Sequence, residues 1–174
     1  MTDMFTPAGT SLNESGVDAD ASDAAASWLA VRAGAHGLLI PLSHAGEVGV
    51  IGDIQVLPYV KSWFQGVINT RGVLSNVIDL AAFLDQGPSE ARSDSALARC
   101  QLIRFNPLLQ LPSALLVDEI AGMRSVHGFV SAEPRQPDEP SYLGAVYVDA
   151  DGGRWREIDL QALASDPSFL DIQA

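Results

Sequence analysis

The chain has 174 residues, of which 47% are hydrophobic and 18% are charged, so it is large enough for one domain with its own hydrophobic core. Its 22 acidic and 10 basic side chains give a formal net charge of −12, which opposes binding to nucleic acid and to anionic membranes and favours protein partners. It has no apolar run long enough to span a membrane and no secretory signal, so direct membrane insertion is not expected.

The first third of the chain divides into a polar tail and strand-like segments. Residues 1–27 carry five acidic side chains and no basic one among mainly small residues, which predicts a disordered acidic tail. Trp28 to Leu42 reads as a hairpin around the turn Gly34–Gly37. Glu47 to Leu57 is strand-like, although two glycines interrupt it, and it ends at Pro58.

The stretch WFQGVINTRGVLSNVIDLAAFL, residues 63–84, predicts strand, tight turn, strand and short helix in succession. The polar turn is Asn69-Thr70-Arg71-Gly72. Glycines at positions 66 and 72 permit close backbone approach or a positive φ. Asp79 is a suitable N-cap for a helical turn over 80–84, because its carboxylate can accept a hydrogen bond from a free backbone N–H.

The second half of the chain alternates short strands with polar loops. The predicted strands are 99–105, 114–120, 126–130, 142–148 and 154–160. The predicted connections are loops at 86–96 and 132–140 and a hairpin turn at 149–153. Asp159 is expected to cap a short helix over 160–163. The single cysteine, Cys100, lies in an apolar run and predicts a buried thiol in a cytoplasmic protein.

These segments together predict an all-β fold. The chain has roughly nine or ten candidate strands separated by Gly and Pro turns, which is typical of a sandwich or barrel and too many for one small barrel. The segments Asn76–Leu80 and Glu157–Leu160 are faintly similar, because each ends a strand and begins a helical turn. Such a repeat would suit two barrels of similar build.

Motifs for catalysis, cofactors or metals are absent from the sequence. None of the three histidines has a second His or Cys at helical spacing, and there is neither a nucleophile elbow nor a phosphate-binding loop. Asp149 and Asp151 imitate the opening of a calcium loop, but the later ligands are missing and a hairpin turn is the better interpretation. The sequence therefore predicts no enzyme, no cofactor and no metal site.

The central stretch also carries a family resemblance. G-V-I-N-T-R-G followed by V-L-x-x-V-I-D-L, from Gly66 to Leu80, resembles the core signature of the CheW family, and the resemblance extends more weakly from about Trp28 to Leu163. It implies two five-stranded SH3-like β-barrel subdomains with short helices, in a domain over 28–165 followed by a C-terminal tail, 166–174. One departure is that Ser75-Asn76 stands where the family often has a proline, which leaves the local turn geometry open.

The family consists of adaptor proteins that join chemoreceptors to a histidine kinase in bacterial chemosensory arrays. The ending Asp-Pro-Ser-Phe-Leu-Asp, residues 166–171, resembles the PilI branch, which serves type IV pilus (twitching) systems. The resemblance thus implies a non-catalytic adaptor in the cytoplasm, at membrane-associated arrays. Its expected partners are the cytoplasmic tip of a methyl-accepting chemoreceptor and the regulatory domain of a CheA-type histidine kinase.

Glu47 and Arg71 match a glutamate and an arginine that lie, in the family, near the groove that meets the receptor. On spacing alone this pair would be a surface ion pair contributing about 0.2–1 kcal/mol, but the resemblance favours a functional groove. The predicted partner-binding residues are Glu47, Val48, Val67, Ile68, Asn69, Arg71 and Gly72. The valines and Ile68 can equally be core, since a barrel strand buries one face.

A rival hypothesis comes from a different functional class. A small β-barrel can also bind a ligand or act as an enzyme through a pocket at the barrel mouth. Convergent polar groups in a closed pocket would favour this rival, whereas an exposed apolar groove beside Arg71 would favour the adaptor.

Overall fold

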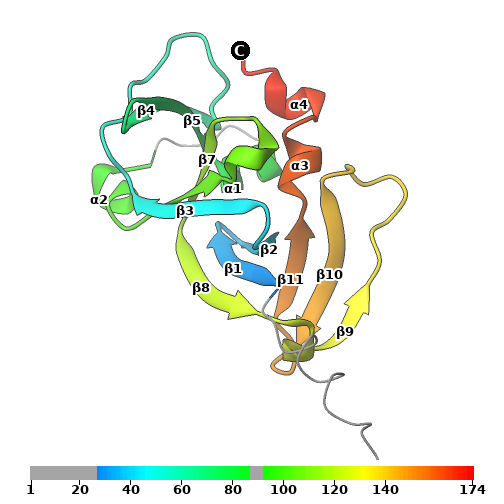
Figure 1. Ribbon diagram of the computed structural model, residues 1–174. Coiled ribbons are helices and arrows are strands. Elements are labelled where there is room, and N and C mark those ends of the chain that lie inside the picture. The colour runs from blue at the N-terminus through cyan, green and yellow to red at the C-terminus, as the bar shows by residue number, and fades with distance from the viewer. Residues whose placement is uncertain (1–26, 87–91) are drawn as a thin grey trace, which may run out of the picture.

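The computed structural model describes residues 27–86 and 92–174 and shows a mostly β chain with short helices (Figure 1). The predicted acidic tail up to residue 26, and residues 87–91 of the predicted loop 86–96, lie outside the described residues. The strands are β1 (Trp28–Ala33), β2 (His36–Pro41), β3 (Ala45–Val50), β4 (Phe64–Thr70), β5 (Val73–Asp79), β6 (Gln101–Phe105), β7 (Ser113–Val117), β8 (Glu119–Arg124), β9 (Phe129–Glu133), β10 (Leu143–Asp149) and β11 (Arg154–Ile158). The α-helices are α1 (Leu80–Asp85), α2 (Asp94–Leu97), α3 (Leu160–Leu163) and α4 (Pro167–Leu170), and 3-10 turns cover Pro107–Leu109 and Val126–Gly128.

The strands form two sheets, one of which is inserted in the sequence of the other. A five-stranded sheet has the order β3-β6-β7-β5-β4, and a six-stranded sheet has the order β8-β1-β2-β11-β10-β9. The five-stranded sheet is thus built from chain between β2 and β8, while the six-stranded sheet uses chain from both sides of that insertion. The predicted all-β fold with two subdomains is confirmed, with the difference that one sheet has six strands instead of five.

The sixth strand arises where the sequence predicted one strand over 114–120. The chain divides at Asp118 into β7 and β8, which belong to different sheets. Every residue of β7 is buried, because Ala114 and Leu116 pack into the five-stranded subdomain while Leu115 and Val117 pack between the subdomains. A strand buried on both faces shows no polar alternation, so its end is not visible in the hydrophobic pattern.

One central core joins the two subdomains. It contains side chains from both sheets, such as Val31 and Leu115, together with Phe83 of α1 and Phe169 of α4. The rings of Trp63 and Phe169 stack with centroids 6.1 Å apart. Each subdomain also has a smaller core of its own. Within the segment 166–174, which was predicted to be a C-terminal tail, Pro167–Leu170 form α4, and Phe169 is 3% exposed and lies in the shared core.

Both predicted helix caps are confirmed. Asp79 ends β5 and its Oδ1 accepts a hydrogen bond from the backbone N–H of Ala82, 3.2 Å away, at the start of α1. Asp159 follows β11 and accepts from the N–H groups of Gln161 and Ala162 at the start of α3. The two similar sequence segments thus perform the same local task in the two subdomains.

Three predicted segments differ in detail. The strand predicted over 47–57 is shorter, since β3 ends at Val50 and the following residues are irregular except for Gln55. The loop predicted over 86–96 contains α2, which Ser93 caps by accepting from the N–H of Ala96. The strand predicted over 126–130 begins as a 3-10 turn and becomes strand only at Phe129.

Gly66 shows why the five-stranded subdomain can close. Gln55 pairs with Val67 of β4 through two backbone hydrogen bonds of 2.8 and 3.0 Å. Gly66 has φ +135°, and a Cβ placed there would lie 2.2 Å from the carbonyl oxygen of Gln55. The absence of a side chain therefore lets the segment after β3 reach the free edge of β4.

Candidate functional site

The predicted turn between β4 and β5 is a two-residue hairpin turn. Thr70 and Val73 are the last paired residues of β4 and β5, and the turn residues Arg71 and Gly72 have φ of +52° and +83°. The Asn69 side-chain oxygen accepts a hydrogen bond of 3.0 Å from the Gly72 N–H and so braces the turn. This geometry favours Asn-Gly or Gly-Gly, so an arginine at its first position is held in a region that non-glycine residues occupy rarely.

The structure brings Glu47 and Arg71 together at the surface. They lie on or beside β3 and β4, which are the opposite edges of the five-stranded sheet, so the sheet must curl for them to meet. Glu47 Oε1 lies 3.6 Å from Arg71 Nη2, and the two side chains are 52% and 81% exposed. The pair is therefore a loose, solvated ion pair, and the guanidinium is reachable by a partner.

Two grooves flank this pair. The first, which we name the hairpin groove, has a volume of about 520 Å³ and lies between the β4–β5 turn and the connection from β6 to β7. The second, the edge groove, has a volume of about 370 Å³ and lies between β3 and β4. The wall surface of the hairpin groove is mainly apolar, although only five of its twelve lining residues have apolar side chains, namely Val73, Phe105, Pro107, Leu111 and Pro112. Glu47, Thr70 and Arg104 line both grooves.

Arg104 on β6 is the cation at the centre of this region. Its Nη2 donates a hydrogen bond to Thr70 Oγ1, which ties β6 to the end of β4. Among the described residues no carboxylate oxygen lies within 4.0 Å of its guanidinium. The arginine is half-buried, so it combines a fixed position with unused hydrogen-bond donors.

Four of the seven predicted partner-binding residues, Glu47, Ile68, Asn69 and Arg71, line one or both grooves. Val48, which is 44% exposed on β3, and Gly72 of the turn line neither groove, and Val67 is partly buried against the shared core. Ile68 borders the edge groove, but it is 3% exposed and packs in the core of the five-stranded subdomain. Its role is to hold β4 in place, and its side chain offers little surface to a partner.

Arg104, Thr70 and the apolar residues that line the hairpin groove are not among the partner-binding residues predicted from the sequence. One signal was available for Arg104, since it is the single charged residue within the apolar strand QLIRF. Its position beside Glu47 depends on the antiparallel pairing of β3 with β6, in which Val48 faces Ile103. That pairing joins residues far apart in the sequence and is not visible in any local pattern.

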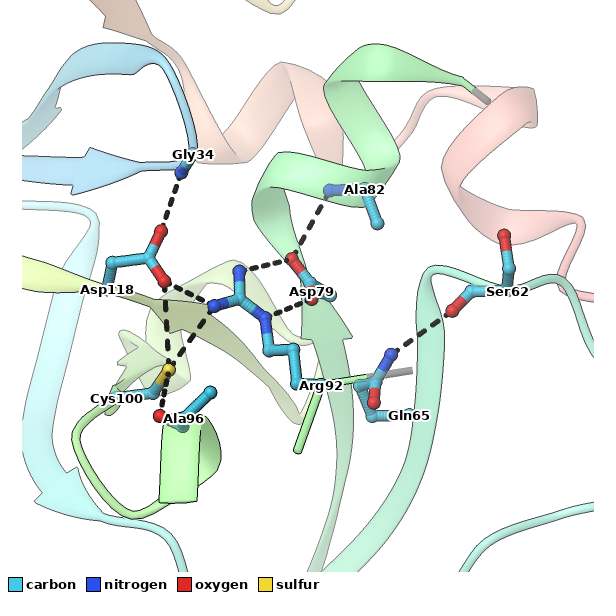
Figure 2. Close-up of polar contacts among 9 residues, drawn as sticks. All are labelled: Gly34, Ser62, Gln65, Asp79, Ala82, Arg92, Ala96, Cys100 and Asp118. Atoms are coloured by element: carbon cyan, nitrogen blue, oxygen red, sulfur yellow. Dashed lines mark hydrogen bonds and ion pairs between the residues drawn. The ribbon is translucent and has the colours of Figure 1, made fainter. Parts of the chain in front are cut away.

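A second polar cluster lies where the two subdomains meet (Figure 2). Arg92 Nε donates to Asp79 Oδ2 over 2.6 Å and Nη2 donates to Asp79 Oδ1 over 3.1 Å, while Nη1 donates to Asp118. Asp118 also accepts a hydrogen bond of 2.6 Å from the backbone N–H of Gly34, in the β1–β2 turn. The cluster therefore connects the ends of β5 and β7 with a turn of the other sheet, and we name it the Arg92 clamp.

The ionisation of the clamp follows from its contacts. The hydrogen bond from Arg92 to Asp79 raises the pKa of Arg92 above its usual value, because it outweighs the burial of the guanidinium, which acts to lower that pKa. Burial opposes ionisation of Asp118, but hydrogen bonds from Arg92 and from the N–H of Gly34 outweigh it and lower the pKa of Asp118. Burial raises the pKa of the Cys100 thiol, whose Sγ lies 3.4 Å from Arg92 Nη1. The charged side chains of the cluster therefore have a structural role, since they connect the two subdomains. Cys100 is a protonated, buried thiol beside them.

The described residues contain no group of three or more His, Cys, Asp or Glu side chains that could hold a metal ion. In the part of the chain that the structure describes, none of the helices is both long and apolar enough to cross a membrane. The predicted turn at 149–153 is present, with Asp149 Oδ1 accepting from the N–H groups of Asp151 and Gly153. Those contacts explain the carboxylate of Asp149 as part of the turn.

Comparisons with known proteins agree with this fold. A family model described as the CheW-like domain matches residues 27–168. Protein PilI of Pseudomonas aeruginosa is 29% identical over 153 residues, which are 86% of this chain and 83% of that protein. The crystal structure of the scaffolding protein TtCheW from Thermoanaerobacter tengcongensis is similar with a TM-score of 0.61 at 18% identity, over 76% of this chain and 83% of that chain. Since the family model matches far more than half of the sequence, the chain belongs to the CheW-like domain family.

Proposed function

We propose that this chain is a non-catalytic adaptor that couples methyl-accepting chemoreceptors to a CheA-type histidine kinase in a system that controls type IV pilus twitching motility. Membership of the CheW-like family supports a chemosensory adaptor, and the relation to PilI favours the pilus output. We place its site of action in the cytoplasm, at membrane-associated arrays. The observation that carries the proposal is the exposed Glu47–Arg71 pair between two grooves.

The geometry suits binding better than catalysis. The hairpin groove lies beside Arg71 and has mainly apolar walls, as expected for a surface that receives another protein. The rival, a ligand-binding or enzymatic barrel, requires several polar groups that converge in one closed pocket. Arg71 and Glu47 are largely exposed, so they can exchange their weak mutual contact for contacts with a partner.

Coupling follows from two binding surfaces on one rigid body. The shared core and the Arg92 clamp fix the two subdomains to each other. A receptor bound to one surface then holds the kinase domain on another surface in a defined orientation. Such coupling is a free energy between two sites, and it needs no reaction within the adaptor.

Arg71→Ala tests the proposal. The pair is mostly exposed, so we expect the substitution to cost about 1 kcal/mol or less of unfolding free energy. We expect it to weaken binding to a receptor-tip fragment or to the kinase regulatory domain by about 2 kcal/mol, as interface arginines often do. Arg154→Ala is the matched control, because Arg154 forms an exposed ion pair with Glu133 on the other subdomain.

Isothermal titration with both partners, beside urea denaturation, gives the two measurements. Glu47→Ala is expected to weaken the same interaction as Arg71→Ala. A folded Arg71→Ala protein that binds both partners with unchanged affinity would exclude this surface from the function.

A further inference from the structure

We propose that the hairpin groove receives an acidic side chain carried on an apolar segment of the partner protein, and that Arg104 binds its carboxylate. This inference rests on the proposed function, because it names the chemistry by which the adaptor recognises a partner. Three features of the groove support it: an arginine and a buried hydroxyl that have, respectively, no carboxylate partner and no hydrogen-bond partner among the described residues, and exposed apolar side chains at the rim.

Five of the ten basic residues form an ion pair, namely Lys61, Arg71, Arg92, Arg154 and Arg156. Among the described arginines outside these pairs, Arg32 and Arg124 lie over the Trp155 ring, and Arg99 and Arg135 are exposed. Arg104 is half-buried and contacts the neutral hydroxyl of Thr70 instead. Its guanidinium carries five N–H donors in a planar fork, a geometry that matches a carboxylate held by two hydrogen bonds.

The neighbouring Glu47–Arg71 pair adds to this arrangement. Glu47 also lines the hairpin groove, but its Oε1 lies nearest to Arg71, at 3.6 Å. The carboxylate of Glu47 therefore pairs with Arg71 and forms no ion pair with Arg104. An incoming carboxylate meets two guanidinium groups and one carboxylate, so the local field favours an anion although the whole chain is acidic.

A second polar group borders the same groove. Ser113 is 2% exposed and lines the groove, and its Oγ has no hydrogen-bond partner among the described residues. Buried hydroxyl groups without a partner are rare, because they lose their hydrogen bonds to water without replacement. A bound segment that offers a backbone or side-chain polar atom at this depth would satisfy it.

The rim favours a protein segment over a small anion. Val73 lines the groove at 54% exposure, and Leu108, which follows the lining residue Pro107 in the sequence, is 84% exposed. A free carboxylate would leave these apolar side chains in water. A segment with an aliphatic or aromatic residue beside its Asp or Glu would cover them while it pairs with Arg104.

Arg104→Met tests the inference, because methionine keeps the aliphatic length and removes the charge. Loss of a charge-assisted hydrogen bond predicts about tenfold to a hundredfold weaker binding of whichever probe binds the unmodified protein, a receptor-tip fragment or the kinase regulatory domain. Arg99→Met is the matched control, since Arg99 is exposed just before β6 and lines neither groove. We expect the control to bind the probe with unchanged affinity. We expect both variants to unfold at a urea concentration close to the midpoint of the unmodified protein.

The partner's carboxylate is then located by changing each Asp and Glu of the probe to its amide. One amide variant should lose the same factor as Arg104→Met, and combining the two changes should cause no further loss. If the unmodified adaptor binds neither probe, the proposed function itself fails. If it binds a probe that Arg104→Met binds equally well, the function stands and this inference is wrong. The proposed protein segment would also be wrong if propionate binds in the groove while the probe binds Arg104→Met and the unmodified protein equally well.

Discussion

Replacing Arg92 by methionine should be among the more damaging single substitutions in this chain. Arg92 and Asp79 are 17% and 2% exposed, while Asp118 is 36% exposed. Asp79 keeps one hydrogen bond, from the N–H of Ala82, and Asp118 keeps the one from the N–H of Gly34. The substitution therefore leaves a fully buried carboxylate without its counter-charge, and breaking such a pair costs about 3–5 kcal/mol.

Urea denaturation followed by tryptophan fluorescence measures this loss directly, because Trp28, Trp63 and Trp155 are all buried. Arg154→Met is the control, since its ion pair with Glu133 is exposed on both sides and should contribute about 1 kcal/mol or less. Equal, small losses in the two variants would refute the reasoning, because they would show that solvent already compensates the buried carboxylate of Asp79.

The dependence on pH gives a second check. The pKa of Asp118 is lower in the folded protein than its usual value near 3.8, so its contribution to stability is complete above about pH 4. That contribution is lost as the pH falls through the lower, folded pKa. The difference in unfolding free energy between the unmodified protein and Arg92→Met should therefore be smaller at pH 3 than at pH 7. A difference that grows toward low pH would contradict the assignment of the Arg92–Asp118 contact.

Gly66→Ala should lower the free energy of unfolding, measured by urea denaturation, by about 2–4 kcal/mol, because the new Cβ would meet the Gln55 carbonyl oxygen. An unchanged free energy of unfolding would mean that the segment around Gln55 does not close the sheet. Phe169→Ala should cost about 3–5 kcal/mol and its exposed neighbour Leu170→Ala about 1 kcal/mol or less, and similar small losses would show that α4 is not part of the core. Arg71→Asn should raise stability by about 0.5–1 kcal/mol through its better fit to the turn, with weaker partner binding in the same titrations.

Local chemistry explains the features that the sequence predicted well. The caps at Asp79 and Asp159 need only an aspartate at a strand end before an apolar helical turn, and both follow from neighbouring residues. The β1–β2 hairpin is marked by glycine-containing turn residues in the same way. The division at Asp118 was missed because β7 is apolar on both faces and nothing local distinguishes its end from the start of β8.

The candidate site was predictable in part. Family resemblance placed Glu47 and Arg71 in one groove, and the structure shows them as neighbours. The resemblance gave no information on exposure, so Val67 and Ile68 were both predicted to bind a partner. The two residues face opposite sides of β4, where Ile68 packs in the core of the five-stranded subdomain and Val67 is partly buried against the shared core. Arg104 reaches the site through the pairing of β6 with β3, and a single sequence carries no record of that pairing.

The insertion of one sheet within the other also has a consequence for synthesis on the ribosome. The β1–β2 hairpin emerges first, yet its neighbours come much later in translation, since Arg32 pairs with Glu119 and Leu38 with Arg156. The five-stranded sheet is complete in the nascent chain before either neighbour has been made. The five-stranded subdomain can therefore fold during translation. Until β8 and β11 have been synthesised, the apolar strands β1 (WLAVRA) and β2 (HGLLIP) have unpaired edges. A nascent chain that stalls shortly after Asp118 would expose those strands to aggregation and to chaperones.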